Sequence, residues 1–239
     1  MDNLVKIIQA MTDAVFEWFD CLSHPYQTCD QVVSDEVSAR DKIAKSLRLW
    51  GTAFAISLIL QLPLYRFAGI DWKDMQFNLS NVVLVLLILL LTLSVIHLGL
   101  RAYRIDSKLP DTVAIYAVMV GCFSPLVVIL QYPSNINLLL QIQHAKHESL
   151  DLYGTIAYVL KGVATPGESY FDILASVSSG LLPFVSFLLI AALVNRISAH
   201  YQVDKYKVAS SVAMSMMLIT FPVTFLAALL MFAMYVAIT

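Results

Sequence analysis

The chain has 239 residues, of which 59% are apolar and only 13% are charged, and its mean hydropathy is +0.75. A soluble domain carries about 25% charged residues, so 15 basic and 17 acidic side chains are too few to cover a globule of this size. The composition excludes a soluble enzyme, a nucleic-acid-binding protein and a disordered chain, and it predicts an all-α integral membrane protein whose first partner is the lipid bilayer.

Residues 1–48 are expected to form a cytoplasmic segment of amphipathic helices. Apolar residues recur there at intervals of three and four, which is typical of one helical face: Leu4, Ile8, Met11, Val15, Trp18 and Leu22. Residues 1–20 carry four acids and one lysine, whereas helices that lie on anionic membranes are usually basic. This charge favours docking of the face formed by Leu4, Ile8, Met11, Val15 and Trp18 onto a partner, or onto the protein's own cytoplasmic surface.

The sequence also predicts where the helices of this segment end and begin. His24-Pro25 is expected to end the first helix, because proline cannot continue a helix from its interior. A second helix should begin near Asp30, with Ser34 as an alternative capped start, and run through "SDEVSARDKIAKSLRL" into the first membrane span.

Residues 49–239 are predicted to form a transmembrane domain of five spans. A bilayer core about 30 Å thick needs about 20 apolar residues in a helix, and four segments without Asp, Glu, Lys or Arg meet this length. A shorter fifth segment contains Gln61 and Pro63. The expected spans are about 50–66, 79–100, 112–131, 173–195 and 208–236, with an outer loop over 132–172 that holds surface helices or one re-entrant helix.

The basic residues predict the orientation of these spans. If the N-terminus is cytoplasmic, the inside segments 1–48, 101–111 and 196–207 carry eleven Lys and Arg residues, and the outside segments carry four. Cytoplasmic loops are enriched in these residues. We therefore expect the C-terminus outside. A sixth span within 132–172 would move three basic residues to the outer side, so five spans fit better.

Prolines and small residues mark one region as a candidate cavity or packing site. Pro63, Pro125, Pro183 and Pro222 each remove a backbone donor from a predicted span, and "SVSSGLLP" (176–183) adds four small residues. Such residues line transporter sites or let helices pack closely, and packing is favoured here. The candidate residues are Pro125, Ser179, Gly180, Pro183 and Pro222. The four long spans hold no Asp, Glu, Lys or Arg, which argues against ion-coupled transport.

Two groups of residues have metal-capable side chains. Cys21, His24 and Cys29 lie within nine residues, but zinc sites want four ligands in recognisable pairs. His144 and His147 lie one helical turn apart and are followed by Glu148, a pattern that helical surfaces often carry without a metal. We therefore expect no cofactor, no metal and no catalytic residue.

The order of segments resembles the Yip1-domain family of five-span membrane proteins. The resemblance rests on "LSHPYQTCDQVV", then "DEVSARDKIAKSLRL", then "VVLVLLILLLTLSVIHLGLRAYR", and on a third span, "DTVAIYAVMVGCFSPLVVIL", with Tyr116 near its start and Pro125 near its centre. It covers the chain from about Leu22 onward, although the 132–172 loop is longer than the family usually shows. It implies a non-enzymatic membrane component, an adaptor of vesicle traffic in eukaryotes or an inner-membrane protein in bacteria, and the bacterial location is favoured.

The expected function is a scaffold or adaptor subunit that assembles with other membrane proteins or with itself. An alternative is a small permease, channel or lipid-handling protein with its path near Ser176–Pro183. A third interpretation is a membrane enzyme with a site at His144 and His147.

Overall fold

The computed structural model describes residues 2–67, 75–147, 154 and 170–220, and within these ranges it contains helices and no strand. The bounds of the elements are as follows: α1 Asp2–Ser23, α2 Pro25–Val33, α3 Ala39–Phe67, α4 Met75–Ala102, α5 Leu109–Met119, the 3₁₀ turn η2 Gly121–Phe123, α6 Ser124–His147 and α8 Tyr170–Tyr201. A further helical stretch covers 205–220. The predicted all-α class is therefore confirmed for this part of the chain.

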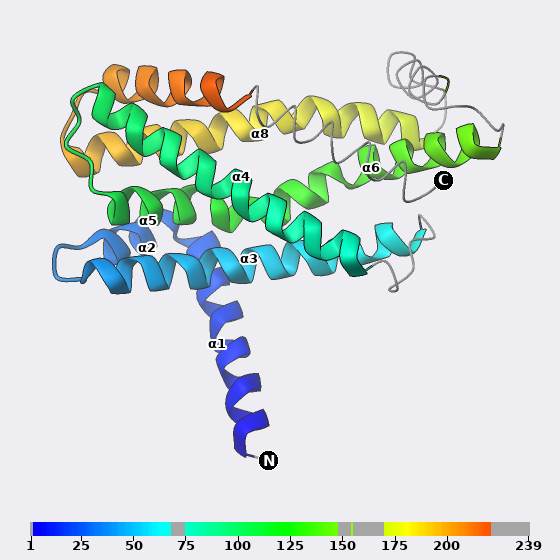
Figure 1. The fold of residues 1–239 in the computed structure, drawn as a ribbon, viewed down its shortest axis with the longest axis horizontal. Helices are drawn as coiled ribbons and strands as arrows, with labels where there is room; N and C mark the ends of the chain where they lie inside the picture. The colour runs from blue at the N-terminus through cyan, green and yellow to red at the C-terminus, as the bar shows by residue number, and fades with distance from the viewer. Residues whose placement is uncertain (1, 68–74, 148–153, 155–169, 221–239) are drawn as a thin grey trace.

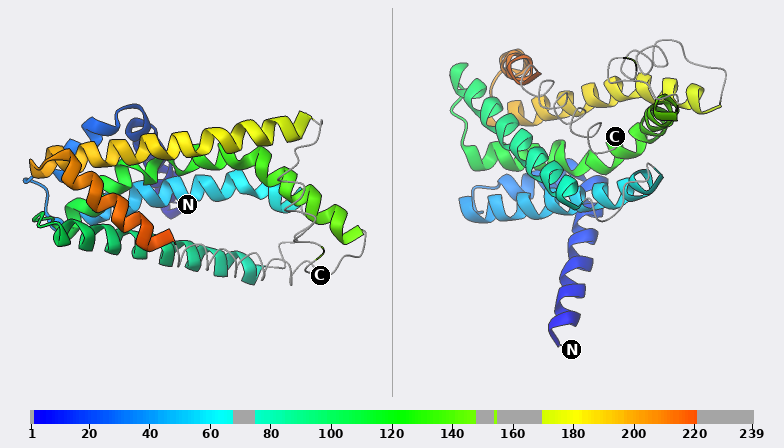
Figure 2. Two further views of the ribbon diagram at one scale, coloured as in Figure 1. Left: turned by 90° about the horizontal axis from the view of Figure 1, so that it is seen from above. Right: turned by 45° about the vertical axis from the view of Figure 1, so that its right-hand side comes forward.

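Most of the helices form one elongated bundle (Figure 1). The beginning of α3, the connection from α4 to α5 and the end of α8 lie together at one end, whereas the end of α3 and the end of α6 lie at the other. Helix α1 leaves this bundle crosswise, as the right-hand view in Figure 2 also shows. We call α1 the arm.

Three helical segments are long and apolar enough to cross a membrane: Ala39–Pro63, Leu109–Asn137 and Ile173–Tyr201. They contain most of the predicted span 50–66 and all of 112–131 and 173–195. The predicted span 79–100 lies within α4, of which Leu87–Ala102 counts as a shorter apolar helix. The predicted span 208–236 is helical as far as residue 220, and the rest of it lies outside the described residues.

The expected second helix was placed wrongly. Helix α2 begins at Pro25, not near Asp30, and it ends at Val33 instead of continuing into the first span. Proline is well suited to the first turn of a helix, where its missing N–H has no partner in any case. Helix α3 starts separately, because the Ser38 hydroxyl oxygen accepts a hydrogen bond from the Asp41 backbone N–H at 3.2 Å and caps the new helix.

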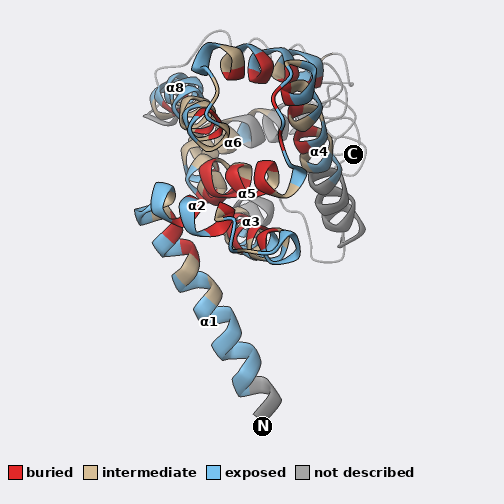
Figure 3. Ribbon diagram, turned by 90° about the vertical axis from the view of Figure 1, so that its left-hand side faces the viewer, coloured by how far each residue is buried: buried red, intermediate tan, exposed pale blue. Residues whose placement is uncertain are grey.

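The packed core lies at the end of the bundle where α3 begins. Residues 25–49, 93–122 and 193–212 surround it, and we call this region the head. Its largest fully buried side chains come from α2, α3, α4, α5, α8 and the 205–220 stretch, and they include Val32, Leu49, Ile96, Leu100, Ile115, Met119, Leu193, Ile197 and Val212. Figure 3 shows that the arm, by contrast, is buried only where it meets the bundle.

Two glycines permit close contacts between helices. A Cβ at Gly121 would lie 2.6 Å from Cδ1 of Trp50, so α3 packs directly on the turn between α5 and α6. At Gly99, α4 packs against Ser211 and Ser215 of the 205–220 stretch. Small residues therefore bring these helices close together.

Candidate functional site

A buried cluster of ionisable side chains joins four helices of the head. Lys42 of α3 donates a hydrogen bond to Asp111 of α5 at 2.8 Å, and another to the carbonyl oxygen of Val33 at the end of α2 at 3.0 Å. His200, near the end of α8, lies 3.3 Å from the second carboxylate oxygen of Asp111. Lys42 and Asp111 are both buried. Each partner offsets the loss of hydration of the other, so this cluster fixes the positions of α2, α3, α5 and α8.

A second ion pair connects α2 with α8. Arg196 of α8 pairs with Asp30 and also interacts with the thiol of Cys29, which is fully buried. Burial raises the pKa of Cys29 from its ordinary value of 9.0 to about 11, although the positive charge of Arg196 partly opposes this increase. Cys29 is therefore a protonated, inert thiol at neutral pH.

The last turns of the arm are fastened to the bundle. Glu17 forms ion pairs with Arg48 and, at 4.0 Å, with Lys45, both on α3. The indole N–H of Trp18 donates a hydrogen bond to the carbonyl oxygen of Cys122 at 2.8 Å. The Sγ atoms of Cys21 and Cys122 are 3.0 Å apart. These contacts hold the arm against α3 and against the turn η2.

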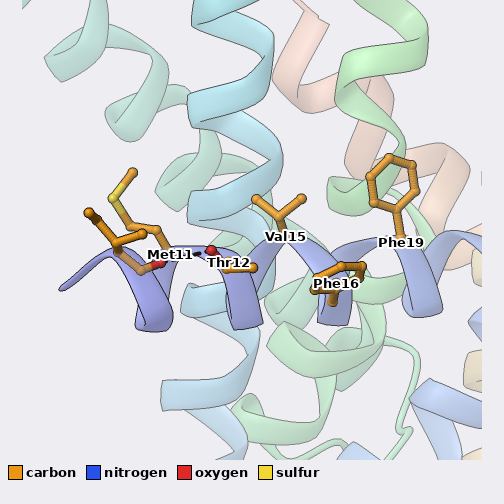
Figure 4. Close-up of a pocket in the computed structure, with 6 residues that line it drawn as sticks. Met11, Thr12, Val15, Phe16 and Phe19 are labelled. Carbon is orange, nitrogen blue, oxygen red and sulfur yellow. Dashed lines mark hydrogen bonds between the residues drawn. The ribbon is translucent and has the colours of Figure 1, made fainter. Parts of the chain in front are cut away.

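The predicted docking face is divided by this attachment. Trp18 is only 5% exposed and packs within the protein's own core, whereas Ile8 is 56% exposed and Met11 is 65% exposed. Val15 lies between these extremes, and the side chain of Leu4 is outside the described residues. Figure 4 shows the free part of the face, where a shallow apolar hollow is lined by Ile8, Met11, Thr12, Val15, Phe16 and Phe19.

The predicted intramembrane candidates that the structure describes lie on α6 and α8 and differ in exposure. Pro125 is buried near the start of α6, and Pro183 is exposed on α8. Gly180 is also exposed, and a Cβ there would have no neighbour within 4 Å. Ser179 lies 3.0 Å from the hydroxyl of Ser134 on α6. Pro222 lies outside the described residues.

Serines connect α6 with α8 at this position. The hydroxyl of Ser134 lies 2.9 Å from that of Ser178 and also bonds to the carbonyl oxygen of Ala175 at 3.2 Å. Hydroxyl groups between apolar helices satisfy one another in this way. These hydroxyl contacts join α6 to the first half of "SVSSGLLP".

The metal-capable groups are placed as follows. Cys21 and Cys29 are buried, whereas His24 is exposed and lies 3.5 Å from Asp20. His144 and His147 belong to the last turns of α6, but their side chains and Glu148 lie outside the described residues. Among the side chains that the structure describes, no three His, Cys, Asp or Glu residues are arranged to hold a metal ion.

Sequence reasoning did not identify the buried cluster of the head. In the sequence, Lys42 contributes only to the count of basic residues that predicts the orientation, and neither Asp111 nor His200 is among the candidate site residues. The available signal was that Asp111 directly precedes a long apolar run. Its partner is 69 positions away, so the pair becomes visible only when the order of the helices in space is known.

Comparison of the chain with protein-family models, with curated proteins and with solved structures found no match in any of the three.

Proposed function

We propose that the protein is a non-enzymatic membrane scaffold that assembles with other membrane proteins through its arm. One observation carries this proposal: Glu17 and Trp18 fasten the arm to the bundle at its C-terminal end, while the rest of it projects away from the bundle. A helix held in this way presents a surface without having to be ordered first, which lowers the entropic penalty of association.

The ionisable groups of the head support the same proposal. Lys42, Asp111 and His200 connect helices to one another, and so do Asp30 and Arg196. The buried Lys42–Asp111 pair specifies one arrangement of these elements more than it adds stability. The head is then a rigid base that sets the direction of the arm.

The proposed topology has five spans, with the head and the arm on the cytoplasmic side and the C-terminus outside. What supports it is the clustering of the three basic-rich segments at one end of the bundle, together with the excess of basic residues there. The proposed location is the bacterial inner membrane, which the resemblance to the Yip1-domain family favours. Tyr206 lies in the head and is 82% exposed. A thiol reagent that does not cross the membrane should therefore label Tyr206→Cys only in permeabilised cells.

The scaffold proposal is tested by removing the free part of the arm. A chain that lacks residues 2–13 keeps Glu17, Trp18 and Cys21, so the head should stay folded. Cross-linking in intact membranes followed by purification should recover specific partners with the full chain and not with the shortened one. Tyr206→Ala, an exposed change away from the arm, is the matched control. An identical set of partners for the full and shortened chains, or no partner for either, would refute the proposal.

A further inference from the structure

Contacts define the level at which the arm crosses the bundle. Glu17 pairs with Arg48 of α3, and Trp18 bonds to the carbonyl oxygen of Cys122 in η2. Trp50 of α3 packs against the neighbouring Gly121. The arm, the Arg48–Trp50 region of α3 and the turn η2 therefore lie at one level along the axis of the bundle.

The polarity of the bundle changes at this same level. Beyond it, α3 from Gly51 to Pro63, α6 from Ser124 to Gln141 and α8 from Ile173 to Ala192 contain no Asp, Glu, Lys or Arg. On the other side lies the head, with its ion pairs and basic connections. The eleven residues of α5 correspond to a depth of about 16 Å, and α5 is apolar because it is buried in the head. The arm thus marks the boundary between an ion-paired head and uncharged spans.

The apolar face of the arm is turned toward the uncharged side. Glu17 reaches back to Lys45, which is closer to the beginning of α3 than Arg48 is, so the polar face of the arm is turned toward the head. In Figure 4, Met11, Val15 and Phe19 extend in the other direction, along α3 toward its C-terminal half. The arm and the spans consequently expose apolar side chains on the same side of one plane.

We propose that the arm lies in the plane of the membrane at its cytoplasmic boundary, with Ile8, Met11, Val15 and Phe19 inserted among the acyl chains of that leaflet. This inference rests on the proposed cytoplasmic position of the head. The occupant of the apolar face is lipid, because this face lies next to exposed apolar side chains of the spans, on the same side of the boundary. Leu126 and Ile129 of α6 are examples of these side chains. Trp18 and Trp50 lie at the boundary, where tryptophan is enriched in membrane proteins.

This inference explains how an acidic helix can lie on a membrane. A free helix needs basic residues to reach an anionic surface. The arm is instead held at the surface by the spans to which it is joined, so its local concentration there does not depend on charge. Asp13 and Asp20 face away from the lipid, as the helical period requires, and they leave an acidic surface for proteins in the cytoplasm.

The test uses spin labels on single introduced cysteines in the full chain, reconstituted alone in phosphatidylcholine vesicles. Met11→Cys, Val15→Cys and Phe19→Cys report on the apolar face, and Lys6→Cys and Asp13→Cys report on the polar face. Phe187→Cys on α8 and Tyr206→Cys in the head are the references for lipid and for water. The three native cysteines are buried, so the unmodified chain serves as the blank.

Accessibility to oxygen, which concentrates in lipid, is compared with accessibility to a neutral nickel chelate present on both sides. The ratio of oxygen accessibility to nickel accessibility should rise and fall along the arm with a period of about 3.6 residues. It should reach the value of Phe187→Cys on the apolar face and that of Tyr206→Cys on the polar face. Nickel access at every position would overturn the proposal. So would exclusion of both reagents from the apolar face, which would indicate a second copy of the chain. Because no other protein is present, the result does not depend on whether the scaffold proposal holds.

Discussion

The indole N–H of Trp18 donates a hydrogen bond to the carbonyl oxygen of Cys122 across 2.8 Å, although the two residues are 104 positions apart. The acceptor lies in η2, just before Pro125 in the first turn of α6. Backbone groups near such a break need partners from elsewhere in the fold. The arm supplies one of them, so the irregular turn and the attachment of the arm depend on each other.

Trp18→Phe should loosen the arm without emptying its site. The ring remains, but the N–H is lost, and a buried carbonyl left without its donor costs about 1–3 kcal/mol. The expected result is a lower unfolding temperature in detergent and faster proteolysis within α1. Phe16→Leu, a change at a side chain that is 69% exposed, should alter neither. Equal protease resistance of Trp18→Phe and the unchanged chain would show that the hydrogen bond does not hold the arm.

Breaking the buried pair in the head should destabilise the fold strongly. Lys42→Met leaves Asp111 buried beside His200, and Asp111→Asn leaves the ammonium group of Lys42 buried beside a neutral partner. Removing one member of a buried pair typically costs about 3–5 kcal/mol. Denaturant unfolding of both single variants and of the double variant gives the coupling energy.

The double variant should lose less stability than the sum of the two single losses, because it leaves no charge unpaired. Arg101→Gln is the control, since Arg101 lies 3.8 Å from Asp106 in an exposed pair that contributes little. If the single losses simply add, the two side chains do not act as a pair.

Two glycines of the chain form a matched pair for testing the contact between α3 and η2. A methyl group at Gly121 would lie 2.6 Å from the ring of Trp50, whereas one at Gly51 would meet nothing within 4 Å. Gly121→Ala should therefore destabilise the protein by about 1–3 kcal/mol through overpacking. Gly51→Ala should be neutral or stabilise α3 by up to about 1 kcal/mol. Thermal unfolding and the tryptophan emission spectrum check both changes, and a neutral Gly121→Ala would mean that Trp50 is free to move.

The sequence predicts helices and long apolar segments well because hydropathy and helical period are local properties. It does not distinguish burial in protein from exposure to lipid. The run 112–131 reads as one uniform span, yet its first part, α5, is apolar because it packs inside the head. The start of α2 differs from the expected one for a related reason: Pro25 both ends one helix and begins the next, and the local sequence indicates the first role more strongly than the second.

The candidate site was predicted in part. The stripe from Leu4 to Trp18 predicts an amphipathic helix, and α1 is one. Which part of the stripe the protein itself covers depends on where the arm meets α3 and η2, and no local pattern contains that information. The same limit applies to Lys42 and Asp111, whose pairing depends on two helices that lie far apart in sequence.

The thiol of Cys29 should make the protein less stable in alkaline solution. Its pKa is raised by burial from 9.0 to about 11 in the folded state, in spite of Arg196 nearby. Between these two values the unfolded chain loses this proton and the folded chain keeps it, so the free energy of unfolding falls as pH rises, by about 2–3 kcal/mol in total. Cys29→Ala lacks this titration. The difference in the free energy of unfolding between the unchanged chain and Cys29→Ala is measured by denaturant unfolding in detergent. It should be constant from pH 6 to about 8, and between about pH 9 and 11 the unchanged chain should lose stability relative to Cys29→Ala. A difference that stays constant over the whole range would show that the thiol is not shielded from water in the folded protein.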